Sequence, residues 1–368
     1  MSDKAWTTSE LIETHKETII KLKCEGFGRL RAAQRIIELT GRPCSDKVMR
    51  TVYERLGSAI SKKRTPPIDI RDQSDVIEEQ PIESLIASRV KSSERKKAKA
   101  GIHRRTLELP DTKPVGILVF GDPHVDNNGC DWAKLYEHVQ LANNTDGVLA
   151  ACVGDLQDNW IGRLARLYAN SDVTASDGWR LSEWLLTEMQ WIAIVGGNHD
   201  AWATGPGVDP LAWLSKKCGV MCYAPDEIRI TLQWRGEPEL EPIVWVIRHD
   251  FSGRSWYHPT HGPHKEAMLD GRVHLLTAGH IHQWGQLTTE QRHGRVTHAV
   301  RVRGYKRNDD FARAKGFFEQ TYGEAVLIVV DPQMEGPGRI QMFWDVAQGC
   351  RYLTQLRNRA ASIGNDEF

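Results

Sequence analysis

The pattern of apolar and polar positions first predicts a helical segment over residues 1–60 of this 368-residue chain. Apolar residues recur there at helical spacing, and turn signals separate three segments. The first helix follows the capping-box sequence Thr7-Thr8-Ser9-Glu10, the second covers Arg29–Leu39, and Ser45 caps the third. The second helix is expected to turn inward Ala32, Ala33, Ile36 and Ile37. Three short helices with a glycine turn before the last resemble a helix-turn-helix DNA-binding module.

The third predicted helix carries the residues that would contact DNA. It would present a basic and polar set toward the major groove, namely Lys47, Arg50, Thr51 and Arg55. A small helical bundle with solvated basic residues fits the same pattern. DNA is therefore the expected partner of this module, and regulation or assembly through protein contacts is the alternative.

Residues 61–105 are expected to form a charged linker. Thr65-Pro66-Pro67 stiffens its start, and an acidic stretch runs from Asp69 to Glu83. A basic run then extends from Arg89 to Arg105. Such runs are usually solvated helices or tails, although this one precedes the next domain directly and could also hold nucleic acid there.

Over residues 106–368 short apolar runs alternate with helical stretches, which predicts an α/β domain. Five runs are expected to be buried strands: Val115–Phe120, Val148–Val153, Trp191–Val195, Ile243–Arg248 and His274–Ala278. Two more strands are expected at Ala325–Val330 and Ile340–Trp344. The chain as a whole therefore divides into a helical module, a linker and an α/β domain.

Charge and composition add to this division. The net charge is zero, yet residues 1–105 hold 23 Lys and Arg against 15 Asp and Glu, and the remainder holds 25 against 33. A basic front and an acidic rear suggest a polyanion-binding module joined to a metal-binding body. Seven cysteines do not suggest a disulfide framework. No signal core or membrane-length apolar run is present, so a cytoplasmic protein is expected.

Each of the five predicted strands ends at Asp, His or Asn. The five clusters are Gly121-Asp122-Pro123-His124, Gly154-Asp155-Leu156-Gln157-Asp158, Gly196-Gly197-Asn198-His199-Asp200, His249-Asp250 and Gly279-His280-Ile281-His282. Open α/β sheets build their sites at strand ends, so these clusters are expected to converge. Carboxylate, imidazole and amide ligands without thiolate suit Mn²⁺, Fe or Zn²⁺.

In these ordered motifs the sequence resembles the calcineurin-like metallophosphoesterase superfamily. The resemblance implies a four-layer α/β/β/α sandwich that holds two divalent ions, with Mn²⁺ the most expected. One ion would be held by Asp122, His124 and His282, and the other by Asn198, His249 and His280, with Asp155 bridging them. Two such ions about 3.5 to 4 Å apart lower the pKa of a bridging water, and the resulting hydroxide would be the nucleophile of an in-line displacement.

The resemblance also implies that His199 is the general acid, oriented or tuned by Asp200. A purely structural His199 is the alternative. Three histidines downstream of His249 compete with it as ligand, namely His258, His261 and His264. We prefer His249 because it follows a predicted strand directly.

Substrate contacts are expected just beyond the second cluster. Arg163 and Arg166 would meet phosphates while Trp160 or Tyr168 stacks on a base. An amphipathic helix that packs Trp160, Leu164 and Leu167 inward is the alternative.

A looser resemblance, which includes Arg303-Gly304-Tyr305-Lys306 through Asp331-Pro332, is to phosphoesterases of bacteriophage and prophage genomes described as DNA-repair exonucleases. The leading hypothesis is therefore a two-metal phosphodiesterase that acts on DNA. The alternatives are a hydrolase of small nucleotides or other phosphoesters, and a DNA-binding scaffold with a structural metal site.

Overall fold

The structure is a computed structural model that describes residues 4–57, 81–99, 104–205, 207–255, 257–291, 294–307, 316 and 319–363. The chain divides into two compact units, an N-terminal unit, Met1–Ser92, and a larger unit, Ser93–Phe368. Residues 58–80 and 100–103 of the predicted linker, including Thr65-Pro66-Pro67, lie outside the described residues. Among those described, no helix has the length and apolar character to cross a membrane. All seven cysteines are free thiols.

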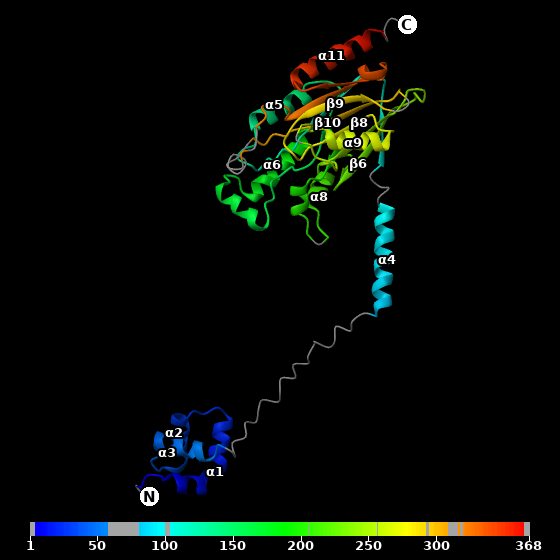
Figure 1. The fold of residues 1–368 in the computed structure, drawn as a ribbon. Helices are drawn as coiled ribbons and strands as arrows, with labels where there is room; N and C mark the ends of the chain where they lie inside the picture. Colours follow the sequence, from blue (N-terminus) through cyan, green and yellow to red (C-terminus); the bar gives the residue numbers. More distant parts are fainter. Residues whose placement is uncertain are drawn as a thin grey trace. The chain divides into compact units, whose positions relative to one another are not determined.

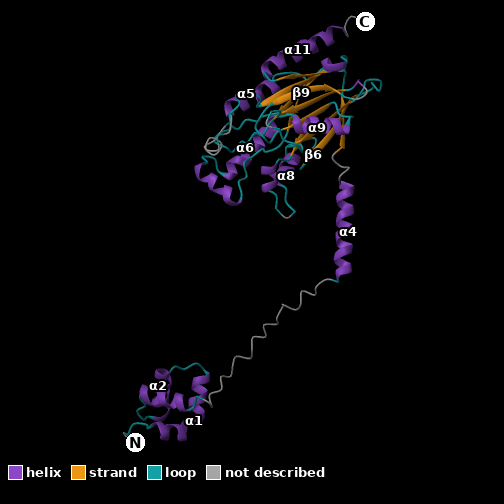
Figure 2. Ribbon diagram, in the orientation of Figure 1, coloured by secondary structure: helices purple, strands orange, loops and turns teal. Residues whose placement is uncertain are grey.

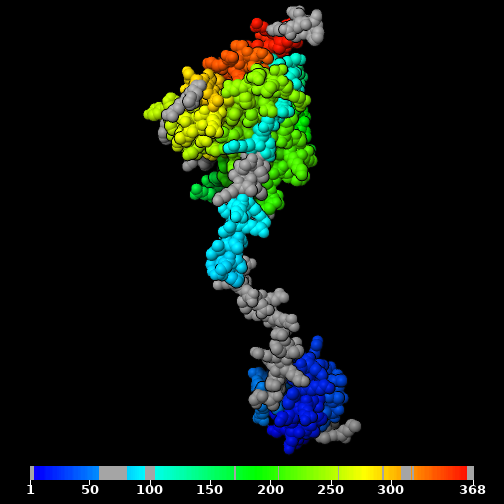
Figure 3. All heavy atoms as spheres, turned by 90° about the vertical axis from the view of Figure 1, so that its right-hand side faces the viewer, coloured from blue at the N-terminus to red at the C-terminus, as the bar shows by residue number. Residues whose placement is uncertain are grey.

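Residues 4–57 of the N-terminal unit form the helices α1 (Thr8–Cys24), α2 (Arg29–Thr40) and α3 (Asp46–Arg55) (Figure 1). The side chain of Thr7 accepts a hydrogen bond from the Glu10 backbone, as the capping-box pattern predicted. Ser45 caps α3 in the same way through the Val48 N–H. The apolar faces of the helices meet in one core. Figure 3 shows one outer face of these helices, in blue.

The predicted inward face of α2 is wrong at one position. Ala32, Ala33 and Ile36 are buried, whereas the Ile37 side chain is 40% exposed. Successive helical residues are about 100° apart around the axis, so a helix that turns Ile36 to the core turns Ile37 toward its side. A further helix, α4 (Ile82–Lys99), lies within the predicted linker and includes the first part of the basic run, for which a solvated helix was one of the expected forms.

The larger unit contains two six-stranded sheets (Figure 2). The first, which we call the β2 sheet, has the strand order β12 (Ile340–Phe343), β11 (Ala325–Val330), β2 (Val115–Phe120), β3 (Val148–Cys152), β4 (Trp191–Val195) and β5 (Tyr223–Ala224). The second, the β7 sheet, has the order β1 (Arg104–Leu109), β6 (Glu227–Trp234), β7 (Ile243–Arg248), β8 (Leu275–Ala278), β10 (Val296–Arg301) and β9 (Gly285–Glu290). Strands β2, β3 and β4 are parallel neighbours, as are β7 and β8.

The two sheets pack face to face between layers of helices. Alternate strand residues such as Ile117 and Val119 of β2 meet Ile230 and Leu232 of β6 in the core between the sheets. The intervening Leu118 of β2 packs outward against helices. The helices on the outer face of the β2 sheet are α5 (Trp132–Asn143), α6 (Ala175–Glu188), α8 (Pro210–Lys217) and α11 (Val346–Ile363).

The helix α9 (His261–Asp270) lies on the outer face of the β7 sheet, where Ala267 packs against Val246 and Leu276. The larger unit is thus a four-layer α/β/β/α sandwich, as the fold class predicted. The bounds of β2, β4 and β7 coincide with the prediction, and β3 and β8 are each one residue shorter. The carboxyl ends of these five strands carry the candidate site.

Candidate metal centre

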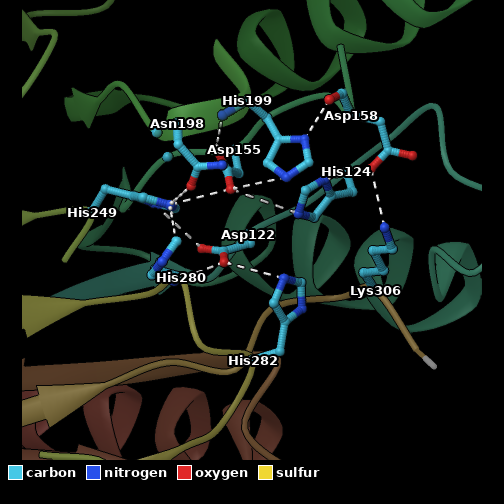
Figure 4. A network of polar contacts seen from close by, with 12 residues as sticks. Asp122, His124, Asp155, Asp158, Asn198, His199, His249, His280, His282 and Lys306 are labelled. Carbon is cyan, nitrogen blue, oxygen red and sulfur yellow. Dashed lines mark hydrogen bonds and ion pairs between the residues drawn. The ribbon is translucent and has the colours of Figure 1, made fainter. Parts of the chain in front are cut away.

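The loops that follow five strands bring all seven predicted ligands together at one edge of the sandwich (Figure 4). Loops after β2 and β3 carry Asp122, His124 and Asp155, and Asn198 is the first residue of the short helix α7 (Asn198–Trp202) that follows β4. Loops after β7 and β8 carry His249, His280 and His282. In three groups the ligand atoms lie within 4.8 Å of one another, namely Asp122 with His124 and His282, Asp155 with His249 and His280, and His124 with Asp158 and His199. The first two groups correspond to the two ion positions that the resemblance implies.

The half that contains His249 has four polar atoms directed at one point. The Nε2 atom of His249 lies 3.0 Å from Asn198 Oδ1, 3.1 Å from His280 Nδ1 and 3.2 Å from Asp155 Oδ2. A single ring nitrogen carries one hydrogen or one lone pair, so it cannot form good hydrogen bonds with all three atoms. A divalent cation that accepts oxygen and imidazole ligands would satisfy them together.

The half that contains Asp122 has buried polar atoms without hydrogen-bond partners. Oδ1 of Asp122 and Nε2 of His124 are fully buried, and neither has such a partner among the described residues. Oδ2 of Asp122 accepts a hydrogen bond from the His280 N–H at 2.8 Å and lies 3.6 Å from His282 Nε2. Unpaired buried polar atoms are rare in proteins, and a metal ion accounts for these.

The Asp155 carboxylate lies between the two halves. Its Oδ1 accepts a hydrogen bond of 2.8 Å from the His199 N–H, which fixes the carboxylate plane. Its Oδ2 is 3.2 Å from His249 Nε2 and 3.9 Å from His124 Nε2. One oxygen therefore faces a ligand of each half, which is the position that a bridging carboxylate requires.

The shifted pKa values of Asp122 and His249 also indicate that the centre is suited to bind positive charge. Burial raises the pKa of the Asp122 carboxyl to about 7; the neighbouring Asp155 adds to this rise, and His249 opposes it. Burial by itself favours a neutral His249 ring, but the carboxylates of Asp155 and Asp122 outweigh burial and raise its pKa to about 10. His249 therefore holds its proton tightly because two buried carboxylates lie beside it. A divalent cation bound there would compensate the same negative charge.

The ligand loops adopt a strained backbone. Four predicted ligands have positive φ angles, namely His124 at 43°, Asp155 at 53°, His280 at 73° and His282 at 50°. A non-glycine residue in the left-handed region costs about 1 to 3 kcal/mol and persists only where its surroundings enforce it. The rest of the fold therefore holds these four side chains in directions that an unconstrained chain would avoid.

Two glycines make room for the buried carboxylates. A Cβ atom at Gly197 would overlap Asp155 Oδ1, and one at Gly279 would overlap Asp122 Oδ1. Each glycine sits beside a predicted ligand, Asn198 or His280. The glycines in the motifs therefore serve the packing of backbone against carboxylate.

The His199 ring is directed into the centre. Its Nδ1 atom is hydrogen-bonded to the Asp158 carbonyl oxygen, and because a carbonyl only accepts, Nδ1 carries the hydrogen. Nε2 then faces the site, 3.9 Å from Asp155 Oδ2. Trp160 and Trp202 pack against the ring, with centroids 4.7 and 4.2 Å away. Burial, with a contribution from His124, lowers the pKa of His199 to about 4.

The predicted link between Asp200 and the His199 ring is wrong. The Asp200 carboxylate accepts hydrogen bonds from the backbone N–H groups of Asp155, Leu156 and Gly197, at 2.8, 3.1 and 2.8 Å. Asp200 is the third residue of the short helix α7 (Asn198–Trp202), where an acidic side chain turns back to cap the helix start. Asp200 therefore supports the loops of Asp155 and Asn198, and the Asp158 carbonyl orients the His199 ring.

Asp158 is a site residue that the sequence reasoning did not single out. Its Oδ1 lies 2.9 Å from His124 Nδ1 and 3.2 Å from Lys306 Nζ, and its other oxygen accepts a short hydrogen bond from Asn127. Although burial opposes ionisation, the bond to His124 keeps the pKa of Asp158 well below its usual range. The sequence signal that could have identified Asp158 as a site residue is its position three residues after the predicted ligand Asp155.

The predicted substrate residues lie on and beside the short helix η1 (Gly162–Asn170). Arg163 and Arg166 are exposed, and Trp160 is half-buried between His199 and Lys306, whose Nζ lies 4.7 Å from its ring centroid. His258, His261 and His264 belong to none of the metal-type groups found among the described residues.

In the N-terminal unit, Lys47, Arg50 and Arg55 of α3 are exposed and Thr51 is half-buried. Arg50 is paired with Glu54 at 3.0 Å, which offsets part of the positive charge of this face.

No family model and no curated protein matches the chain. Among solved structures, a predicted phosphoesterase from Streptococcus pneumoniae TIGR4 aligns over 62% of this chain and 97% of its own, with 12% identity and a TM-score of 0.29. A Vps29 mutant from Entamoeba histolytica covers the same shares with 12% identity and a TM-score of 0.33. NAD nucleotidase from Haemophilus influenzae covers 62% and 49%, with 10% identity and a TM-score of 0.31. Likeness at this level is partial, and the fold class rests on the two sheets described above.

Proposed function

We propose that the larger unit is a two-metal phosphoesterase whose favoured substrate is the phosphodiester backbone of DNA. The observation that carries this proposal is the convergence of the seven predicted oxygen and nitrogen ligands around Asp155, whose Oδ2 faces a ligand on either side, with His199 beside them for proton transfer. A purely structural site needs no such additional histidine.

Two divalent ions bound here would supply Lewis-acid activation of water and of the phosphoryl oxygens. The chain's own residues define the rest of the reaction. Asp122, His124 and His282 would hold one ion, Asn198, His249 and His280 the other, and Asp155 both. The strained loops fix these side chains before substrate arrives, so little reorganisation accompanies the reaction.

His199 is suited to the leaving-group side of the reaction. Its Nδ1–H is committed to the Asp158 carbonyl, so the ring is held with Nε2 toward the substrate. In its protonated form Nε2–H would donate to the departing oxygen as the ester bond breaks. Because burial lowers the pKa of His199 to about 4, only a small fraction of the rings carries this second proton at neutral pH, and the reaction would draw on that fraction.

Support for DNA comes from outside the metal centre. The three-helix unit exposes Lys47 and Arg55 on one helix, and Arg163 and Arg166 are exposed just beyond the half-buried Trp160. Basic side chains beside an aromatic ring suit a nucleic-acid strand, because the former contact phosphates and the latter stacks on bases. The resemblance to phage-encoded exonuclease-type phosphoesterases points in the same direction.

The test uses the full chain, stripped of metal and then supplied with Mn²⁺, Fe²⁺ or Zn²⁺. End-labelled single-stranded DNA, double-stranded DNA and a bis-aryl phosphodiester are the substrates. Metal-dependent hydrolysis of DNA supports the proposal. Hydrolysis of the aryl ester alone favours the small-phosphodiester alternative, and DNA binding without hydrolysis of any substrate favours the scaffold. A truncated control must begin before Arg104, because β1 (Arg104–Leu109) pairs with β6 over all six residues.

A further inference from the structure

Arg301, the last residue of β10, is a buried cation that joins two loops at the metal centre, the loop after β7 and the loop after β8. The residue is 1% exposed. Its Nε donates to the Pro259 carbonyl at 2.7 Å, its Nη1 donates to the Gly279 carbonyl, and its Nη2 donates to Asp250 Oδ1 at 2.8 Å. The planar guanidinium group presents its donors in a fixed fork, so these three acceptors are held in fixed relative positions.

Two of the three acceptors are neighbours of predicted ligands. Asp250 directly follows His249, and Gly279 directly precedes His280. The Gly279 N–H also donates to the His249 carbonyl at 3.0 Å, so the two loops are already in backbone contact. The Asp250 oxygen that receives Arg301 accepts the Phe251 N–H as well, at 2.9 Å, which folds this side chain over its own turn.

We propose that Arg301 is a positioning residue that sets the separation of His249 and His280, and thereby the affinity of the ion position these two residues share with Asn198 and Asp155. This inference rests on the proposed metal-dependent function. The imidazole atoms that Arg301 would position lie 3.1 Å apart, and they come from the ends of different strands, β7 and β8. A clamp that grips both loops behind the ligands keeps such a pair from separating.

The position at Asp122, His124 and His282 provides an internal comparison. Among the described residues, Arg301 bonds to no sequence neighbour of Asp122 or His124, and it reaches Asp122 only indirectly, through the Gly279–His280 backbone that packs on this carboxylate. The Gly279 carbonyl is separated from His282 by two intervening residues. A clamp of this kind is therefore expected to affect one ion far more than the other. A general contribution to stability would weaken both.

The test is a Mn²⁺ titration of the metal-free full chain by calorimetry and electron paramagnetic resonance. The variants are Arg301→Lys, Arg301→Gln and Asp250→Asn. Arg229→Gln is the matched control, because Arg229 forms an Arg–Asp pair with Asp270 in the same unit without touching a ligand loop. The wild type and the control are expected to bind two Mn²⁺ with a spin-coupled spectrum. Each clamp variant is expected to bind one ion normally and the other about 10 to 100 times more weakly, with loss of the coupled signal.

Thermal melts in chelator establish that each variant is folded. If the Arg301 variants fail to fold, Asp250→Asn decides the question, because the Asp250 side chain is 29% exposed and the loss of its charge weakens only one arm of the clamp. Two wild-type affinities in Arg301→Lys and Asp250→Asn overturn the proposal, as does equal weakening of both ions. If the wild type binds no Mn²⁺, the metal-dependent function fails first and the clamp fails with it.

Discussion

The metal centre and helix α3, the proposed DNA contact, position their polar residues by opposite means. At the centre, His124 and Asp122 are fully buried, ligand loops adopt left-handed backbone angles, and atoms of different strands lie about 3 Å apart. On α3, Lys47 and Arg55 project from a regular helix into solvent, and the nearest ordered partner of Arg50 is a neighbouring Glu54. The proposed catalysis at the centre depends on exact geometry, whereas the proposed DNA binding by α3 depends on net charge.

This difference sets how each region should respond to substitution. A buried and strained site concentrates its function in a few atoms, so single changes are expected to act by orders of magnitude. A charged helix face adds contributions that water and salt weaken, so single changes are expected to act by small, nearly additive steps. The predictions below test the contrast from its strongest to its weakest case.

Replacement of the shared carboxylate should have the largest effect. Asp155→Asn removes the negative charge that faces both halves of the centre, and we expect phosphodiester hydrolysis to fall at least about 10,000-fold, or about 5.5 kcal/mol. Measurement of kcat/KM with saturating Mn²⁺ checks this, alongside Mn²⁺ stoichiometry. Asp226→Asn, a change of an exposed carboxylate, serves as the control. Activity within tenfold of the wild type would contradict the bridging role.

His199→Gln should act on chemistry more than on metal binding. We expect kcat on DNA to fall about 1,000-fold, because the departing alkoxide loses its proton donor. Hydrolysis of an aryl diester should change far less, since an aryl oxide leaves without protonation. Equal losses on the two substrates would show that His199 supports the site rather than the leaving group.

Gly197→Ala tests the close packing beneath the centre. The new Cβ overlaps Asp155 Oδ1, so we expect a loss of about 1 to 3 kcal/mol in unfolding free energy and weaker Mn²⁺ binding. Gly205→Ala is the matched control, because its Cβ meets no atom within 4 Å. Denaturant unfolding and a Mn²⁺ titration distinguish the two. A Gly197→Ala protein as stable and as metal-avid as the control would rule out this packing.

Substitutions on α3 should have a smaller, salt-dependent effect. Lys47→Ala with Arg55→Ala is expected to weaken DNA binding about tenfold at low salt and to reduce the salt slope by about 2, while aryl diester hydrolysis stays unchanged. Fluorescence anisotropy at several salt concentrations measures the slope. Arg180→Ala, an exposed basic residue of the larger unit, controls for a general charge effect. An unchanged slope would remove α3 from the DNA interface.

The smallest effect is expected at the exposed pair of Arg50 and Glu54. Both side chains are more than half exposed, so Glu54→Gln should change the unfolding free energy of the N-terminal unit by no more than about 0.5 kcal/mol. A denaturant titration with a probe in that unit measures the change. A loss above about 1 kcal/mol would mean that this helix face is structurally constrained in the way the metal centre is.

The sequence predicted the strands that bear ligands because those strands are buried on both faces. Val115–Phe120 and Trp191–Val195 are apolar throughout, so the bounds of these strands could be predicted from the sequence. β1 was missed because five of the six residues of Arg104–Leu109 are not buried and the strand lies at a sheet edge. β6 was missed although Glu227–Trp234 alternates strictly between buried and half-buried positions, a period-two pattern present in the sequence.

Within the site, ligand types could be predicted from the motifs, but the supporting contacts could not. Asp200 follows His199 in sequence, yet helix geometry turns its carboxylate to the backbone. Asp158 contacts His124 because the intervening backbone turns at Asp155, where φ is 53°, and no propensity indicates that turn. Arg301 is 19 residues beyond His282 and reaches the ligand loops only through the pairing of β10 with β8.

The distribution of the ligands over both sheets bears on how the protein folds. Asp122, His124, Asp155 and Asn198 extend from the β2 sheet, and His249, His280 and His282 extend from the β7 sheet. In a folding intermediate with both sheets formed but not yet docked, the four ligands of the β2 sheet would be separated from the three ligands of the β7 sheet. Tight uptake of a cation should therefore begin only at the docking step, and the rate of Mn²⁺ uptake during refolding would time the closure of the sandwich.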